Sequence, residues 1–398
     1  MLLALNYLAF IALGLPDGLI GVAWPSVRVS FGLPLDAVAG LLFAFTSCYV
    51  LASFASGWLL ARMSVGMLLA ASCVATAASL AGYAAAPTWS LMIAAAAVGG
   101  LGAGAIDVAV NHFVSASYGP RILNWMHAAY GMGAAGGPLV MRSALGAGLG
   151  WRSGYALTAL AEVALAAAFI PSLRRWPPPP DRAAIAGPRL RPASMLAILR
   201  LRTAWLGIAN FLVYTGLEMA AGIWVYSLFT ISRGVSMSVA ALWVAIYWAS
   251  LTLGRIVFGF VVEATGAIAL VRGSILAMGL GATLVWLEPT TLASFLGFAL
   301  IGLAAGPVFP CLMSGTAERV GEANAAYGVG LQIAAAALGQ SFVPGAVGAA
   351  AGALGLEVVG PALAAGALIL FCLHELMAAS LREPARDRPT VEEVAREA

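Results

Sequence analysis

The sequence has few charged residues, no lysine and only three histidines. Charged residues make up 9% of the chain and hydrophobic residues 62%. Soluble domains carry about 25% charged residues, so this composition excludes an ordinary water-soluble fold. The formal net charge of +3 comes from arginine alone, and no basic patch interleaved with aromatic residues is present. We therefore expect no nucleic-acid partner.

Cysteine is also scarce, and its placement excludes two kinds of site. All four cysteines lie inside apolar segments, with no CxxC pair and no histidine at ligand spacing: Cys48, Cys73, Cys311 and Cys372. The sequence therefore predicts no metal site, no disulfide framework and no cofactor.

Long hydrophobic segments dominate the chain instead. A bilayer core of about 30 Å needs roughly 20 apolar residues per helix. Short polar breaks separate twelve such segments, which predicts an all-α membrane protein with 12 transmembrane helices, embedded in a lipid bilayer. The first is too long, and too closely followed by others, to be a cleaved signal peptide. The predicted spans are 2–25, 36–60, 66–86, 89–117, 122–148, 152–171, 203–230, 236–262, 267–287, 290–316, 324–350 and 354–381.

Arginine placement predicts the orientation and the domain division. Residues 172–202 contain seven arginines against the single Asp181, so this linker is expected on the cytoplasmic side. Pro177 to Pro180 make its start extended. Both termini, including a charged tail at 382–398, are then expected in the cytoplasm of a bacterium, with the spans in its inner membrane. The linker separates two six-helix bundles, 1–171 and 203–381.

The two halves are related in sequence. Gly100, Leu101 and Gly104 match Gly302, Leu303 and Gly306 at an offset of 202, and the stretches 129–133 and 326–330 match at an offset of 197. Parallel six-helix repeats related by an axis along the membrane normal are the build of the major facilitator superfamily. We therefore expect two pseudo-symmetric bundles of that fold.

Two acids lie inside the predicted spans. Asp107 is near the middle of the apolar run from Val98 to Ser117, and Asp17 lies in the first span. A carboxylate at membrane depth costs about 2.5 to 3.5 kcal/mol even on insertion scales, so such residues usually face a polar cavity and a transported ion. The two acids indicate a carrier coupled to protons, although the sequence leaves sodium open as the coupling ion.

The first 145 residues resemble the fucose permease group of sugar and proton symporters. Asp107, Asn111, Phe113-Val114 and Gly119-Pro120 resemble that group's fourth helix, and Leu15-Pro16-Asp17 resembles its first. The resemblance implies proton uptake at Asp107, and substrate contact with coupling at Asp17. His127 and Tyr130 depart from it, because fucose permease itself has amide side chains there. The mechanism is therefore expected to carry over more closely than the substrate.

Polar residues at three- and four-residue steps predict the substrate site, because such steps place side chains on one helix face. These faces belong to the fourth, fifth and seventh spans, with further residues from the second half. The predicted substrate-binding residues are Asn111, Asn124, His127, Tyr130, Asn210, Tyr214, Glu218, Trp224 and Gln332.

A cytoplasmic gate is the third predicted feature. The loop after the second span resembles the superfamily signature, but Ala61 stands in place of the usual acid before Arg62. The second copy keeps Arg255 and Glu263. By this resemblance, Arg62, Arg255 and Glu263 are expected to hold the cytoplasmic ends of the halves together.

The favoured function is proton-coupled symport of a sugar or similar small polar solute by a monomer. The alternative is proton-driven export of small amphipathic compounds, because Gly133, Gly137 and Pro138 resemble part of an antiporter motif. An intramembrane enzyme is disfavoured, because no nucleophile with a base is present. A receptor is disfavoured because the chain has no soluble output domain.

Overall fold

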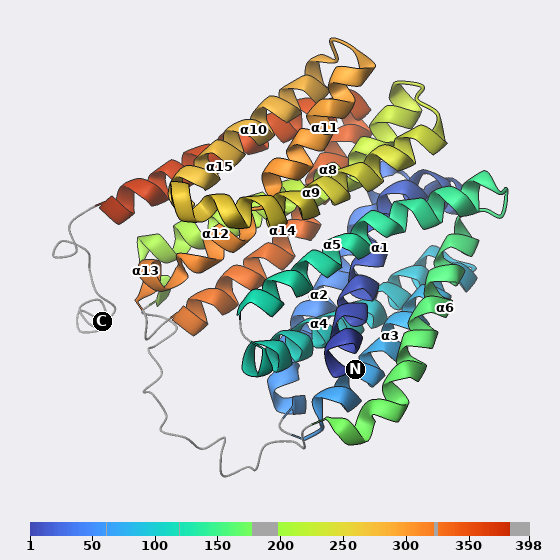
Figure 1. The fold of residues 1–398 in the computed structure, drawn as a ribbon. Helices are drawn as coiled ribbons and strands as arrows, with labels where there is room; N and C mark the ends of the chain where they lie inside the picture. Colours follow the sequence, from blue (N-terminus) through green and yellow to red (C-terminus); the bar gives the residue numbers. More distant parts are fainter. Residues whose placement is uncertain (61, 119, 177–197, 322–324, 383–398) are drawn as a thin grey trace. The chain divides into compact units, whose positions relative to one another are not determined.

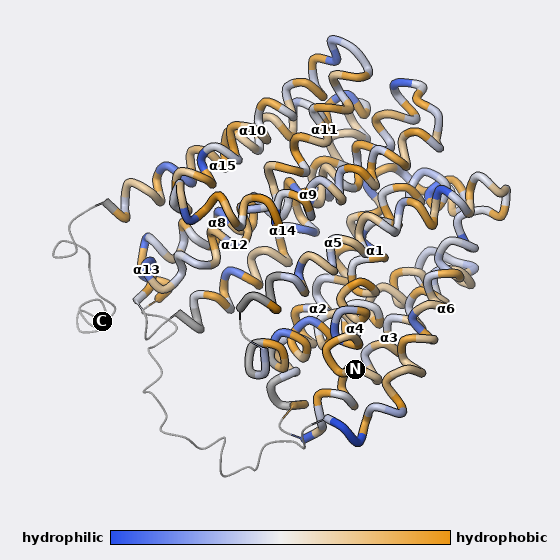
Figure 2. The backbone as a smooth tube through the Cα atoms, viewed as in Figure 1, coloured by the Kyte–Doolittle hydropathy of each residue, from blue (hydrophilic) through white to orange (hydrophobic). Residues whose placement is uncertain are grey.

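A computed structural model describes residues 1–398 except 61, 119, 177–197, 322–324 and 383–398. The described residues are helical and contain no strand (Figure 1). Eleven of the helical segments are long and apolar enough to cross a membrane, and Figure 2 shows apolar residues along their length. The predicted all-α membrane fold is confirmed. The proline-rich start of the predicted linker and the tail beyond residue 382 lie outside the described residues.

The first six helices are α1 (Leu2–Phe31), α2 (Val38–Leu60), α3 (Val65–Ala85), α4 (Trp89–Ser117), α5 (Pro120–Gly146) and α6 (Trp151–Phe169). The short 3-10 turn η1 (Leu35–Ala37) precedes α2, and a second one, η2 (Ile170–Arg175), follows α6. Of these six helices, the 27-residue α5 is not among the eleven apolar spans, because residues such as Asn124, His127 and Arg142 lower its mean hydropathy.

The later helices are α8 (Arg202–Ser227), α9 (Met237–Thr265), α10 (Ala267–Leu287), α11 (Thr291–Ala305), α12 (Val308–Ser314), α13 (Thr316–Val320), α14 (Ala325–Leu354) and α15 (Val359–Arg382). A π-helical turn, Leu228–Ser232, extends α8.

Two boundaries differ from the sequence prediction. The first span does not end at Pro25 but continues to Phe31, and Gly32 closes it with a φ of 65°. A proline removes one helical hydrogen bond without necessarily ending a membrane helix. The tenth span is also interrupted, because α11 ends at Ala305 and α12 begins after Gly306 and Pro307.

The described chain divides into two units. Unit 1 comprises Met1–Ala186, Gly222–Thr252 and Gly348–Leu356, and unit 2 comprises Gly187–Ala221, Leu253–Val347 and Glu357–Ala398. The end of α8, the start of α9 and the end of α14 therefore group with the first six helices. The predicted division into bundles 1–171 and 203–381 stays a prediction.

Close helix crossings explain the repeated glycines. In unit 1, a Cβ atom at Gly104 of α4 would lie 2.3 Å from the carbonyl oxygen of Tyr49 in α2. In unit 2, a Cβ atom at Gly306 would lie 2.5 Å from the backbone nitrogen of Arg255 in α9. The matching glycines thus allow the backbones of the second and fourth helices of each half to approach closely, as small residues do in membrane proteins.

Candidate functional site

Asp107 of α4 is hydrogen-bonded through both carboxyl oxygens. The hydroxyl of Tyr49 in α2 donates to Oδ2 at 2.5 Å, and Asn111 Nδ2 donates to Oδ1 at 2.8 Å. Asn111 Nδ2 also lies 2.8 Å from the Asp107 backbone oxygen. Asp107 is half-buried, and no ion pair to it exists within the described residues. Its charge is therefore balanced by neutral donors.

The glycine stripe of α4 places Tyr49 beside this acid. A Cβ atom at Gly100 would lie 2.0 Å from the carbonyl oxygen of Phe45, one helical turn before Tyr49. Gly104 makes the corresponding approach at Tyr49 itself. Gly100 and Gly104, one turn apart on α4, therefore both face α2. The resulting close approach allows the Tyr49 hydroxyl to reach Asp107.

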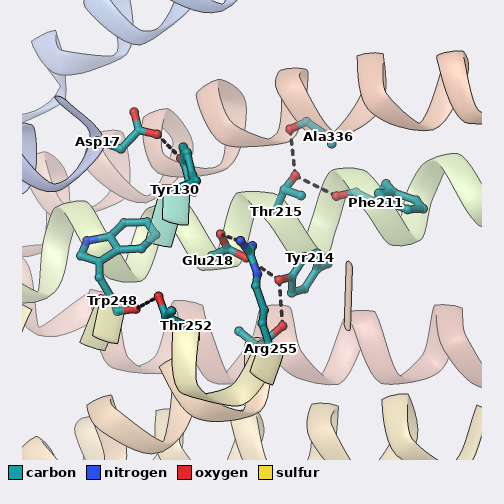
Figure 3. Close-up of polar contacts among 11 residues, drawn as sticks. Asp17, Tyr130, Phe211, Tyr214, Thr215, Glu218, Trp248, Thr252, Arg255 and Ala336 are labelled. Atoms are coloured by element: carbon teal, nitrogen blue, oxygen red, sulfur yellow. Dashed lines mark hydrogen bonds and ion pairs between the residues drawn. The ribbon is translucent and has the colours of Figure 1, made fainter. Parts of the chain in front are cut away.

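Asp17 has a similar arrangement at the crossing of α1 and α5. The Tyr130 hydroxyl of α5 donates to Asp17 Oδ2 across a short hydrogen bond (Figure 3). A Cβ atom at Gly14 would lie 2.1 Å from the carbonyl oxygen of Tyr130, and one at Gly18 would lie 2.1 Å from that of Ala134. Tyr130, predicted to bind substrate, thus contacts the second predicted coupling acid.

A third carboxyl, Glu218 of α8, lies in a cluster within unit 2. Tyr214, one turn earlier, donates to its Oε2, and Arg255 of α9 places Nη2 3.8 Å from its Oε1 (Figure 3). The Tyr214 hydroxyl also lies 2.9 Å from the carbonyl oxygen of Ala305, where α11 ends. Arg255 and Glu218 are 17% and 8% exposed. Arg255, predicted in the cytoplasmic gate, therefore lies with a predicted substrate residue.

We expect Glu218→Gln and Arg255→Gln to be strongly non-additive in thermal unfolding of the purified protein. Each single change removes one member of a largely desolvated charge pair, whereas the double change removes both. Residues in one such network show interaction energies of about 0.5 to 3 kcal/mol. Tyr214→Phe serves as the comparison that keeps both charges. Additive effects of the two glutamine changes would contradict a functional ion pair.

Three other predicted substrate residues are buried in helix contacts. Asn210 Nδ2 donates to the Leu206 carbonyl oxygen within α8, and Gln332 Oε1 accepts a hydrogen bond from Thr316. Trp224 is buried against Gly348, where a Cβ atom would lie 2.4 Å from the indole. Their positions favour packing roles in the described conformation.

The remaining predicted residues are placed as follows. His127 of α5 is half-buried and meets the Phe10 ring edge-on at 5.4 Å, while the side chain of Asn124 lies outside the described residues. Arg62 and Glu263 are both exposed. Their proposed joint action in a gate stays a prediction.

Tyr49 is the functional candidate that sequence reasoning missed. It is the one tyrosine in the apolar span 38–60, and its hydroxyl can donate a hydrogen bond. A polar side chain in an apolar span could have indicated a role for Tyr49. Its partner could not be identified, because Tyr49 and Asp107 are 58 positions apart in the sequence and only the crossing of α2 and α4 brings them together. Within the described residues, no group of three His, Cys, Asp or Glu side chains forms a metal site.

Comparison with known proteins identifies the family of the chain. The family model described as Major Facilitator Superfamily matches residues 7–344. No protein with a curated description matches the sequence significantly.

Solved structures of transporters share the fold at low sequence identity. A D-xylose-proton symporter has 16% identity and a TM-score of 0.75, with 98% of this chain and 99% of that chain covered. The nucleoside transporter NupG has 14% identity and a TM-score of 0.74, with coverage of 96% and 98%. A bacterial homolog of the human lysosomal transporter Spinster has 16% identity and a TM-score of 0.76, with 95% of both chains covered. Because the family model covers most of its length, the chain belongs to the major facilitator superfamily, whose members carry small molecules across membranes.

Proposed function

We propose that the protein is a proton-coupled symporter for a sugar or similar small polar solute. The observation that carries this proposal is Asp107, an acid at membrane depth balanced by the Tyr49 hydroxyl and the Asn111 amide instead of a cation. Such an acid can exist in a neutral and a charged form without breaking an ion pair. A transported proton is the simplest species to interconvert them.

Tyr49 links the proton on Asp107 to a second helix. When Asp107 is ionised, Oδ2 accepts the tyrosine hydrogen at 2.5 Å. A proton on Oδ2 would compete with that hydrogen, so the Tyr49 hydroxyl would rotate toward another acceptor. Proton loading thereby changes the contact between α2 and α4, which is the type of local change that alternating access requires.

Asp17 is proposed as the acid that couples substrate to the proton. Tyr130 contacts it from α5, and His127 lies one turn earlier on the same helix. Carboxylate, phenol and imidazole groups offer donors and acceptors for a hydroxyl-rich solute. The resemblance to sugar and proton symporters supports the same substrate class, as does the fold shared with a D-xylose-proton symporter.

Contacts within unit 1 support an outer gate. A Cβ atom at Gly21 of α1 would lie 2.3 Å from the carbonyl oxygen of Gly222 in α8, and Arg142 Nε donates to Ser238 Oγ at 2.8 Å. If residues 172–202 are cytoplasmic, all four residues lie in the parts of their helices that are nearer the external side of the membrane. We assign these contacts to closure of the external side during transport.

The export alternative rests on Gly133, Gly137 and Pro138. A Cβ atom at Gly133 would lie 1.9 Å from the carbonyl oxygen of Ile11, and one at Gly137 would lie 2.4 Å from that of Leu15. Both glycines thus serve the close crossing of α1 and α5. Since this packing role accounts for them, they give export no independent support.

A ligand screen followed by transport would test the proposal. Purified protein is heated with sugars, nucleosides and amphipathic cations at neutral and acidic pH, and stabilising compounds are then offered to proteoliposomes with an inward proton gradient. We expect a neutral, hydroxyl-rich solute to stabilise the protein and accumulate inside. Stabilisation by amphipathic cations alone, with their movement against the proton flow, would support export instead.

A further inference from the structure

A fourth carboxyl, outside the contacts described above, lies between α3 and α6. Glu162 is 0% exposed and occupies the middle of α6, while Thr76 occupies the middle of α3. Both helices are apolar enough to span a membrane. Glu162 has no role in the proposed transport cycle, although an ionised carboxylate at this depth is costly.

The hydrogen-bond geometry around Glu162 determines where protons can lie. Thr76 Oγ1 is 3.1 Å from Glu162 Oε2 and also 3.1 Å from the carbonyl oxygen of Cys73. A threonine hydroxyl has one hydrogen to donate. It can therefore satisfy the carboxyl group or the Cys73 carbonyl, but it cannot serve both acceptors fully.

A proton on Glu162 resolves this conflict. With the proton on Oε2, the carboxyl group donates to Thr76 Oγ1, and the Thr76 hydroxyl donates to the Cys73 carbonyl oxygen. Every hydrogen then has an acceptor. Without that proton, Oε1 would be a buried charged oxygen with no hydrogen-bond partner in the structure. An unpaired buried charge costs far more than an unpaired neutral carbonyl oxygen.

Among the described residues, no basic side chain forms an ion pair that would offset a charge on Glu162. Cys73 is the titratable group facing it from α3, and Tyr83 lies two turns beyond Thr76, in contact with Tyr155 of α6. Arg152 of α6 instead donates to the Ala86 carbonyl oxygen at 2.8 Å, near the far end of α3. The other elements packed on α6 are η2, α1 and α5, and each carries titratable or charged side chains. In η2, Arg174 and Arg175 lie three turns past Glu162. Those of the two helices are Asp17, Tyr7 and Arg28 in α1, and His127, Tyr130 and Arg142 in α5. Within the described residues, none forms an ion pair with Glu162.

We propose that Glu162 is a proton-binding site separate from the coupling acids, which binds its proton in the folded protein and is hydrogen-bonded through Thr76 to the Cys73 carbonyl oxygen. The bound proton holds α3 against α6, and its loss as the pH rises places an uncompensated charge between them. Glu162 therefore acts as a pH-sensitive element of the N-terminal helices, independently of the direction of transport and of the substrate.

Infrared difference spectroscopy of the full-length purified protein tests this assignment. At neutral pH, the wild-type spectrum minus that of Glu162→Gln is expected to contain the carbonyl stretch of a protonated carboxyl group. Glu318→Gln, which removes an exposed acid, should remove only carboxylate bands. Carboxylate bands alone in the Glu162 difference would overturn the proposal. Bands that also move when sodium replaces choline would assign a cation to the site and likewise overturn it.

Thr76→Val provides a second test that keeps the carboxyl group. Loss of the hydrogen-bond acceptor should move the protonated carbonyl stretch to higher frequency, and an unmoved band would contradict the assigned geometry. Thermal unfolding gives the pH dependence. Because the folded state favours the protonated form, raising the pH above the range in which an ordinary glutamate ionises should lower the melting temperature of the wild type more than that of Glu162→Gln, until Glu162 is ionised in the folded protein too. Equal declines would contradict the switch.

Discussion

Asp107→Asn is expected to abolish accumulation of solute against its gradient while leaving exchange of solute across the membrane intact. Asparagine has nearly the shape of aspartate and still offers an oxygen to the Tyr49 hydroxyl, which now lies 2.5 Å from Oδ2. It cannot take up and release a proton at physiological pH. The variant should therefore carry solute without drawing on the proton gradient.

The expected effect is large and can be measured in proteoliposomes. A gradient of one pH unit corresponds to about 1.36 kcal/mol per proton, enough for about tenfold accumulation. The variant should reach only equal concentrations on both sides, at a rate of counterflow close to that of the wild type. Asp36→Asn, which neutralises an exposed acid beside α2, is the matched control and should accumulate solute normally. Undiminished accumulation by Asp107→Asn would refute the assignment.

Gly18→Ala is expected to destabilise the protein and to separate Asp17 from Tyr130. The new Cβ atom would lie 2.1 Å from the carbonyl oxygen of Ala134 and 2.6 Å from Pro138 Cδ. The first neighbour is backbone and the second is a rigid ring, so α1 and α5 must move apart. Overpacking of this kind costs about 1 to 3 kcal/mol or more.

Gly146→Ala is the control for this change. It adds the same methyl group to α5, but no atom lies within 4 Å of the new Cβ. Thermal unfolding in detergent should show a lower melting temperature for Gly18→Ala only, and its transport rate should fall with the loss of the contact to Asp17. Equal behaviour of the two variants would show that the close crossing is unimportant.

The sequence predicted the membrane helices well because the bilayer fixes their length. Most predicted ends agree with the structure within a few residues, and the two largest differences lie at prolines. The first span, predicted to end at residue 25, continues through Pro25 to Phe31. The tenth span has an unpredicted break after Ala305, at Gly306 and Pro307. Sequence periodicity gives no measure of how well neighbouring helices compensate a lost hydrogen bond.

The site was less predictable because periodicity identifies a polar face without showing what it meets. Asn210 shares its helix stripe with Tyr214 and Glu218, yet its amide is buried and bonded within α8. Tyr49 acts on Asp107 only because glycines bring α2 and α4 together. The motif predicts Arg255 in a gate and gives no sign that its side chain also lies 3.8 Å from Glu218. These relations depend on helix crossings, which a single sequence does not specify.

Proton movement that accompanies solute flow is the most direct test of proton-coupled symport. Proteoliposomes without an imposed gradient are mixed with a solute from the ligand screen in a weakly buffered medium, and the external pH is recorded. Downhill entry of the solute should draw protons inward, so the medium should become more alkaline, and Asp107→Asn should give no such signal. Solute entry with no pH change, or with acidification of the medium, would contradict proton symport.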